Sequence, residues 1–164
     1  MKVVVTLTKE FFKGHPRAGQ STLFARMVRE GVKIHTCRDN AEYWTKKIEM
    51  LKSAGGTLCI REWSGKPYRS PQDTIAEIPA ETVHVSHLKL TRLTFDGPTK
   101  ETRYHSYSAM VNGKNVRVLE IANNDGFVNE RDFVAFLDPL FDKYKVSTIH
   151  LAIIHFTDYK YTKQ

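Results

Sequence analysis

The sequence of 164 residues contains only two cysteines, Cys37 and Cys59. Two cysteines are too few for a disulfide framework, and neither has a second cysteine or a histidine at a zinc-ligand spacing. Such low cysteine usage is typical of proteins from a reducing compartment, so we expect a cytoplasmic location. We also expect no metal site and no other bound cofactor.

Long apolar runs are absent as well, since none approaches the roughly 20 residues that a membrane-spanning helix needs. The longest run, residues 149–156, is interrupted by His150 and His155. The apolar stretch at residues 3–7 is too short for a signal peptide, and no small-residue cleavage site follows it. We therefore expect no membrane among the partners of this protein.

Acidic residues are scarce in the first quarter of the chain. The whole sequence has 25 Lys and Arg against 18 Asp and Glu, which gives a formal net charge of +7. Residues 1–38 hold eight of the positive side chains but only two of the negative ones, Glu10 and Glu30. A positive charge concentrated in this way favours an anionic partner.

The length predicts one domain over residues 1–164, and the apolar periodicity predicts an α+β fold of about six or seven strands with three helices. Strands are expected at about residues 3–7, 57–63, 82–95, 103–110, 114–121 and 146–156, with a short strand or turn at 32–38. Helices are expected at about residues 21–30, 40–54 and 129–141. The tail from residue 158 onward reads as polar.

Three local features carry further predictions. Asp39, with Glu42 three residues later, is expected to cap the second helix, and Asn129 is expected to cap the third. Asn112-Gly113 predicts a tight hairpin turn. Within residues 82–95 the apolar positions shift from odd to even numbers and back, which predicts a bulge or bend of the kind found in small barrels.

The segment that follows the first predicted helix carries the most specific signal. Its residues Gly31, Lys33, Thr36 and Arg38 occupy all four fixed positions of the pattern G-x-K-x-x-[TE]-x-R. This pattern is the signature of the ASCH family, whose members are small domains with a PUA-like β-barrel. The chain therefore resembles that family at this motif.

The resemblance implies a small PUA-like β-barrel with a cleft beside the first helix. The predicted segments 57–63, 129–141 and 146–156 fit the strand, helix and last strand that follow the motif in ASCH domains. The longer middle, residues 64–110, has no counterpart in the smallest members. Because the family was proposed to bind RNA, the first expectation is a domain that binds RNA or a modified nucleotide.

Cations and aromatic rings in this sequence suit such a ligand, because cations pair with phosphates and exposed rings stack on bases. The loop at residues 64–70 combines both kinds of side chain. The expected binding residues are Arg17, Arg26, Arg29, Lys33, Arg38, Lys66, Tyr68 and Arg69, with Tyr43 and Trp63 as further stacking surfaces.

The alternative expectation is an amidohydrolase acting on an N-acylated cytidine-type nucleoside, because some small bacterial ASCH proteins are enzymes of this kind. The resemblance places the nucleophile at Thr36 and its base at Lys33. Those enzymes also use a glutamate before the last helix, where this chain has Asp125, with Glu130 as the fallback. A threonine hydroxyl needs a neighbouring base to take its proton, and a desolvated lysine can be neutral enough to do so.

Both expectations make the same geometric demand. Side chains alternate along a strand, so Lys33 and Thr36 would point to opposite faces of an unbroken strand. A shared site therefore requires a turn or bulge between them. It also requires Asp125 to reach the same cleft, although Asp is one methylene shorter than Glu and an Asp before Gly126 is commonly a turn former.

Overall fold

The computed structural model describes residues 1–161 and has an α+β fold, as the sequence predicts. Residues 162–164 of the predicted domain lie outside the described part. The eight strands are β1 (Lys2–Leu7), β2 (His35–Arg38), β3 (Thr57–Trp63), β4 (Gln72–Pro79), β5 (His84–Asp96), β6 (Arg103–Val111), β7 (Lys114–Val116) and β8 (Thr148–His155). The four helices are α1 (Phe24–Arg29), α2 (Ala41–Ala54), α3 (Val118–Asn124) and α4 (Glu130–Tyr144).

The strands form two open sheets. The smaller sheet has the order β1-β3-β4, with β1 parallel to β3, and the larger antiparallel sheet has the order β2-β8-β5-β6-β7. Within residues 1–161 these strands do not close into one barrel. The additional strand, relative to the six or seven predicted, is β4, which lies in the middle segment 64–110 and pairs with β3.

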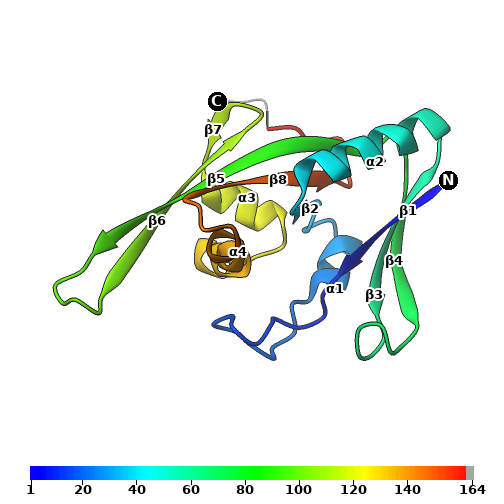
Figure 1. Ribbon diagram of the computed structural model, residues 1–164. Helices are drawn as coiled ribbons and strands as arrows, with labels where there is room; N and C mark the ends of the chain where they lie inside the picture. Colours follow the sequence, from blue (N-terminus) through cyan, green and yellow to red (C-terminus); the bar gives the residue numbers. More distant parts are fainter. Residues whose placement is uncertain (162–164) are drawn as a thin grey trace.

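Helices cover both faces of the larger sheet (Figure 1). α2 packs against β8 and β5 and also contacts β1 of the smaller sheet, so it connects the two sheets. α3 and α4 contact each other on the opposite face of the larger sheet. The motif strand β2 is the edge strand of that sheet. None of the helices in residues 1–161 is long and apolar enough to cross a membrane.

The fourth helix, α3, replaces most of a predicted strand. The hairpin at Asn112-Gly113 forms, but its second strand ends at Val116 and does not continue to Ile121. Val118, Ile121 and Ala122 are buried in the core. Their i, i+3, i+4 spacing matches one face of a helix, and this pattern outweighs the β-branched composition of the segment.

Of the bulge or bend predicted within residues 82–95, the bulge does not form. β5 pairs with β8 along its first part and with β6 along its second part, in both cases without a register shift. The apolar phase changes for another reason: the far end of the β5–β6 hairpin projects beyond α4 (Figure 1), and Leu93 and Phe95 there are each 53% exposed. A register shift occurs instead between β3 and β4, at Ile60 and Arg61.

One of the two predicted helix caps is correct. The side chain of Asn129 caps α4, accepting a hydrogen bond from the Asp132 amide at 2.8 Å. α2 is capped by Asn40 and not by Asp39, through a bond from the Tyr43 amide. Asn40 has a φ of 61°, a left-handed conformation that asparagine tolerates better than most residues.

Candidate functional site

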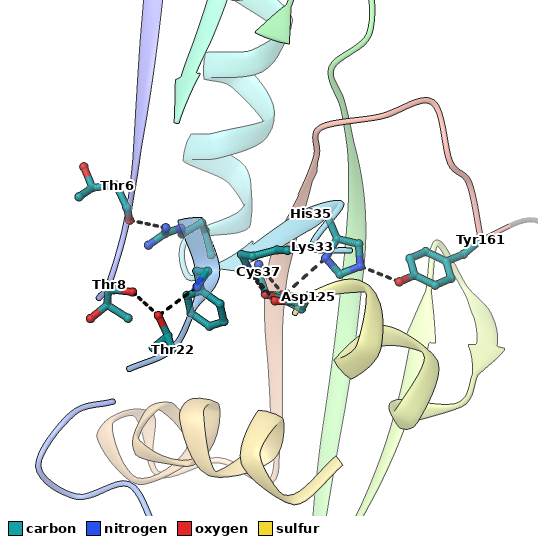
Figure 2. Close-up of polar contacts among 10 residues, drawn as sticks. Thr6, Thr8, Thr22, Lys33, His35, Cys37, Asp125 and Tyr161 are labelled. Atoms are coloured by element: carbon teal, nitrogen blue, oxygen red, sulfur yellow. Dashed lines mark hydrogen bonds and ion pairs between the residues drawn. The ribbon is translucent and has the colours of Figure 1, made fainter. Parts of the chain in front are cut away.

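A buried ion pair joins the motif to the segment that ends α3. The Lys33 ammonium donates a hydrogen bond to a carboxylate oxygen of Asp125 and, at 2.6 Å, another to the Asp125 carbonyl (Figure 2). It also lies 4.3 Å from the centre of the Phe24 ring. Lys33 is 2% exposed and Asp125 4%. Two bonds use two of the three ammonium donors, so one donor remains for a ligand.

Backbone geometry at the end of α3 places Asp125. This residue ends the helix, and Gly126 after it has a φ of +88°, which glycine adopts without strain. Asp125 is thus both a turn residue and the partner of Lys33. Its side chain, although one methylene shorter than that of glutamate, reaches the Lys33 ammonium. Its second carboxylate oxygen accepts from the Cys37 amide at 3.1 Å. Glu130, the fallback, is exposed at the start of α4.

Lys33, Thr36 and Asp125 line one cavity of about 130 Å³, which we call the inner cavity. Much of its remaining wall is aromatic and is formed by Phe24, Phe127, Phe133 and Phe136. An engineered cavity of about 150 Å³ binds benzene, so the inner cavity has the size of about one six-membered ring. It therefore offers an apolar enclosure with a polar end.

Lys33 and Thr36 share this cavity because the motif is not one unbroken strand. β2 begins only at His35, and the amides of Val32 and Lys33 both donate to the carbonyl of Met27 in α1. The turn therefore precedes Lys33, and because Lys33 lies outside β2, the alternation of side chains along that strand does not determine its direction. Within residues 1–161 the Thr36 hydroxyl has no hydrogen-bond partner, and it is not sealed from the cavity. It is therefore available to a ligand.

A larger space of about 870 Å³, which we call the outer groove, adjoins the inner cavity. The two spaces share Arg38 and residues 6–8 of the chain, so they lie side by side, and we call them together the cleft. Aromatic and cationic side chains line the outer groove, namely Trp44, Trp63, Tyr68, Lys9 and Lys66. Tyr68 is 89% exposed, and its ring centre lies 5.0 Å from that of Trp63.

Arg38 stands at the junction of the inner cavity and the outer groove. One of its guanidinium nitrogens donates to the Thr6 carbonyl at 2.6 Å. Arg38 Nε is buried without a hydrogen-bond partner, and Nη1 donates no hydrogen bond within residues 1–161, so Nη1 is the donor open to a ligand. A guanidinium fork with free donors is suited to an anionic group that spans the junction.

Only half of the eight predicted binding residues line this cleft, namely Lys33, Arg38, Lys66 and Tyr68. The other predicted residues lie elsewhere on the molecule. Arg26 and Arg29 line a third hollow beside α1, which adjoins the cleft at Lys9, Glu10 and Phe24. Arg17 and Arg26 form ion pairs with Asp132 and Glu30, respectively. Arg69 and the stacking candidate Tyr43 line neither part of the cleft, whereas Trp63 does. The cations of the basic first quarter therefore do not all line the cleft.

Burial and charge oppose each other in the ion pair. Burial lowers the pKa of the Lys33 ammonium, and the Asp125 carboxylate counteracts that shift. Burial by itself would raise the pKa of Asp125, but the charge of Lys33, together with the polar contacts that Lys33 and His35 make with the carboxylate, outweighs it and lowers this pKa to about 2. The carboxylate is therefore ionised at neutral pH.

His35 and Tyr161, which follow one another in contact from the Asp125 carboxylate, were not predicted as parts of the site. His35 Nδ1 lies 3.4 Å from a carboxylate oxygen of Asp125, and His35 Nε2 lies 2.6 Å from the Tyr161 hydroxyl. The tail was expected to be polar, yet Tyr161 is buried. No sequence pattern relates a motif histidine to a tyrosine 126 residues later, because only the tertiary fold brings them together.

His35, Cys37 and Asp125 form one group, in the part of the chain that the structure describes, whose donor atoms lie close enough to hold a metal ion. A metal would require a thiolate and a carboxylate free to bind it. Burial raises the pKa of the Cys37 thiol well above its ordinary value, and the ammonium of Lys33 already occupies Asp125. This group therefore does not fit a metal site.

The chain was compared with protein-family models, with curated proteins and with solved structures, and none of them matched. A function for the cleft must therefore come from its residues and their geometry.

Proposed function

We propose that this protein binds RNA or a modified nucleotide in the cleft formed by the inner cavity and the outer groove. The observation that carries the proposal is the adjacency of these two differently lined spaces. A nucleotide has matching parts, since its base is a flat ring with polar edges and its phosphate is anionic. In a strand, the neighbouring base offers a second ring for stacking.

The base is proposed to occupy the inner cavity. Its ring would lie among the phenylalanines, of which Phe24 lies in α1 and Phe127 in the connection between α3 and α4, with their rings packed edge to face. Its polar edge would meet the free donor of Lys33 and the hydroxyl of Thr36. Because the cavity volume corresponds to about one six-membered ring, a pyrimidine suits it better than a purine.

The phosphate and the next base are proposed to occupy the outer groove. Arg38 would hold the phosphate at the junction with its free donors, and Lys66 would supply a second cation. Tyr68 and Trp63 would stack on the neighbouring base, a contact worth about 1–3 kcal/mol per base.

Tryptophan fluorescence provides the test, because Trp44 and Trp63 line the outer groove. Titration with a short single-stranded RNA should quench it, and Tyr68→Ala should weaken the affinity at least about fivefold. Tyr104→Ala is the matched control, since Tyr104 is exposed on the β5–β6 hairpin. Equal affinity in the Tyr68 variant and the wild type would contradict the proposed stacking.

Salt dependence tests the phosphate contact separately. The logarithm of the binding constant should fall with the logarithm of salt concentration, with a slope of about −0.7 per phosphate contact on a single strand. Arg38→Gln should make this slope shallower by about 0.7, whereas Arg26→Gln should not change it, because Arg26 is paired with Glu30 outside the cleft. Salt-independent binding would argue against any phosphate contact.

The PUA-like architecture is part of this proposal. It is supported by the position of the motif directly after α1 and by the pairing of the motif strand β2 with the last strand β8. On this view the two sheets, connected by α2, correspond to a barrel that is open between them. The β4–β6 segment would be the addition that lengthens the middle of the chain.

A second candidate function is hydrolysis of the amide of an N-acylated cytidine-type nucleoside. The observation that favours it is the convergence of Lys33, Thr36 and Asp125 on the inner cavity. In this reaction neutral Lys33 takes the Thr36 proton, and the oxygen of Thr36 attacks the amide carbonyl carbon. The carbon–nitrogen bond breaks as Lys33 returns the proton to the departing amine, and water then cleaves the ester of Thr36.

Incubation with N-acetylcytidine, with release of acetate as the measurement, tests this second candidate. Thr36→Val keeps the shape of the side chain but removes the hydroxyl, so release should stop, whereas Thr36→Ser should retain it. Activity that persists in Thr36→Val would exclude this residue as nucleophile. Nucleoside binding without acetate release would support the binding function alone.

A further inference from the structure

We propose that His35 and Tyr161 are positioning residues that orient the Asp125 carboxylate toward Lys33. This inference rests on the proposed function in one respect, namely that Lys33 and Asp125 face the ligand. Figure 2 shows His35 between Asp125 and Tyr161, on the side of the carboxylate that faces away from Thr6 and Thr8. His35 is fully buried and does not line the inner cavity, so it can affect a ligand only through Asp125.

The directions of the hydrogen bonds select one tautomer of His35. The side-chain amide of Asn124 donates to the Tyr161 oxygen at 2.9 Å, which leaves the tyrosine proton free for another acceptor. That acceptor is His35 Nε2, at 2.6 Å. A ring whose Nε2 accepts a hydrogen bond carries its proton on Nδ1, and Nδ1 is the atom that lies 3.4 Å from Asp125.

This tautomer has a consequence for the carboxylate. Nδ1 lies 3.4 Å from the Asp125 oxygen that accepts from the Cys37 amide, which is too far for a full hydrogen bond, so its proton offers that oxygen an electrostatic contact and the other oxygen is left for Lys33. In the opposite tautomer the Nδ1 lone pair would face that oxygen, and two lone pairs would repel each other. The Tyr161 hydroxyl therefore acts on Lys33 through two intermediates, as partners of functional side chains commonly do.

Several other titratable groups face this cluster. They are Lys33, Cys37 and Arg38 of the motif segment, His155 of β8, His84 of β5 and Tyr159 of the tail. Burial lowers the pKa of His155 to about 2, so its ring is neutral and adds no charge. His35 is the nearest of the histidines to Asp125 and the one that contacts it. A pH effect of Tyr161 is therefore transmitted through His35.

The test uses Tyr161→Phe, which keeps the buried ring and removes only the hydroxyl. Tyr159→Phe is the matched control, because Tyr159 lies in the same tail but bonds to Glu120. Nitrogen-15 NMR should show the Nδ1-protonated tautomer of His35 in the wild type and in Tyr159→Phe. In Tyr161→Phe we expect a substantial fraction of the Nε2-protonated tautomer.

The second readout is the pH dependence of N-acetylcytidine affinity. In Tyr161→Phe the acidic limb of this profile should move up by about one pH unit, because Asp125 loses a donor to its charged form. A wild-type His35 protonated on Nε2, or a profile that is identical in Tyr161→Phe and the wild type, would overturn the inference. If neither the wild type nor a variant binds N-acetylcytidine, the second candidate function fails, and the NMR result still decides the role of Tyr161.

Discussion

At the scale of single residues, Lys33 and Asp125 dominate because each is a buried charge whose main partner is the other. Replacing both members of such a pair by apolar residues is often tolerated, whereas removing one leaves an uncompensated charge in the core. The pair therefore has the features expected of a functional element and contributes little net stability as a unit. A variant that removes one member of the pair and a variant that replaces both should therefore differ strongly in their free energy of unfolding.

Asp125→Asn should destabilise the protein by about 3–5 kcal/mol, because the Lys33 ammonium would remain buried without its counterion. The double variant Lys33→Met with Asp125→Leu should recover much of that loss. Urea unfolding of the variants measures both effects. Glu42→Gln is the control, since its pair with Lys46 is exposed, and it should change stability by less than about 1 kcal/mol. Equal losses of unfolding free energy in the single and double variants would contradict this account.

At the scale of elements, the connection between α3 and α4 sets the geometry of the site. Gly126 follows Asp125 with a left-handed φ of +88°, and a Cβ there would meet Lys33 Cβ at 3.1 Å and Lys33 Cγ and Cδ at 3.2 Å. The glycine is thus needed for the backbone and for the space occupied by the lysine stem. The NDG sequence at residues 124–126 indicated a turn, but it did not indicate that the turn packs on the motif.

Gly126→Ala should cost about 1–3 kcal/mol, because alanine is strained at this φ and displaces the Lys33 side chain. It should also weaken ligand affinity, since the displaced ammonium no longer faces the inner cavity. Gly19→Ala is the matched control: it has a φ of +78°, but nothing lies within 4 Å of its Cβ. Unfolding and binding measurements on both variants separate strain from displacement. A Gly126 variant with unchanged affinity would show that the lysine stem accommodates the methyl group.

At the scale of the whole molecule, a row of histidines crosses the larger sheet. His35, His155 and His84 lie in register on β2, β8 and β5, and the His155 and His84 rings stack at 4.0 Å. Burial is the largest cause that lowers the pKa of all three. These rings stay neutral in the folded protein at a pH at which they would be charged in the unfolded chain.

Global stability should therefore fall as the pH drops below about 6.5, where unfolded histidines begin to bind protons. A group whose folded pKa is depressed contributes stability above its unfolded pKa, and this contribution is lost as the pH falls toward the folded value. Each neutral ring adds a slope of up to about 1.4 kcal/mol per pH unit. His155→Gln should flatten the profile between about pH 6 and pH 4, measured by urea unfolding, whereas exposed His105→Gln should leave it parallel to the wild type. A wild-type profile without slope in this range would contradict the prediction.

The sequence by itself determined most of the local structure. β3 has its predicted bounds, α2 lies where periodicity placed it, and α4 begins after its predicted capping residue Asn129. Short-range patterns specify such features because their causes lie within a few residues of one another. The secondary structure at the end of the 114–121 segment was harder to predict, because β-branched residues there favour a strand while the spacing of its buried residues favours a helix.

Only the tertiary structure decided how these elements form a site. The contact of Asp125 with Lys33 joins residues 92 apart, and that of Tyr161 with His35 joins residues 126 apart. It also decided which cations are free, since Arg17 is paired with Asp132 across 115 residues while Arg38 retains open donors at the cleft. Long-range pairing follows from packing of the whole chain, which local propensity and charge counts do not encode.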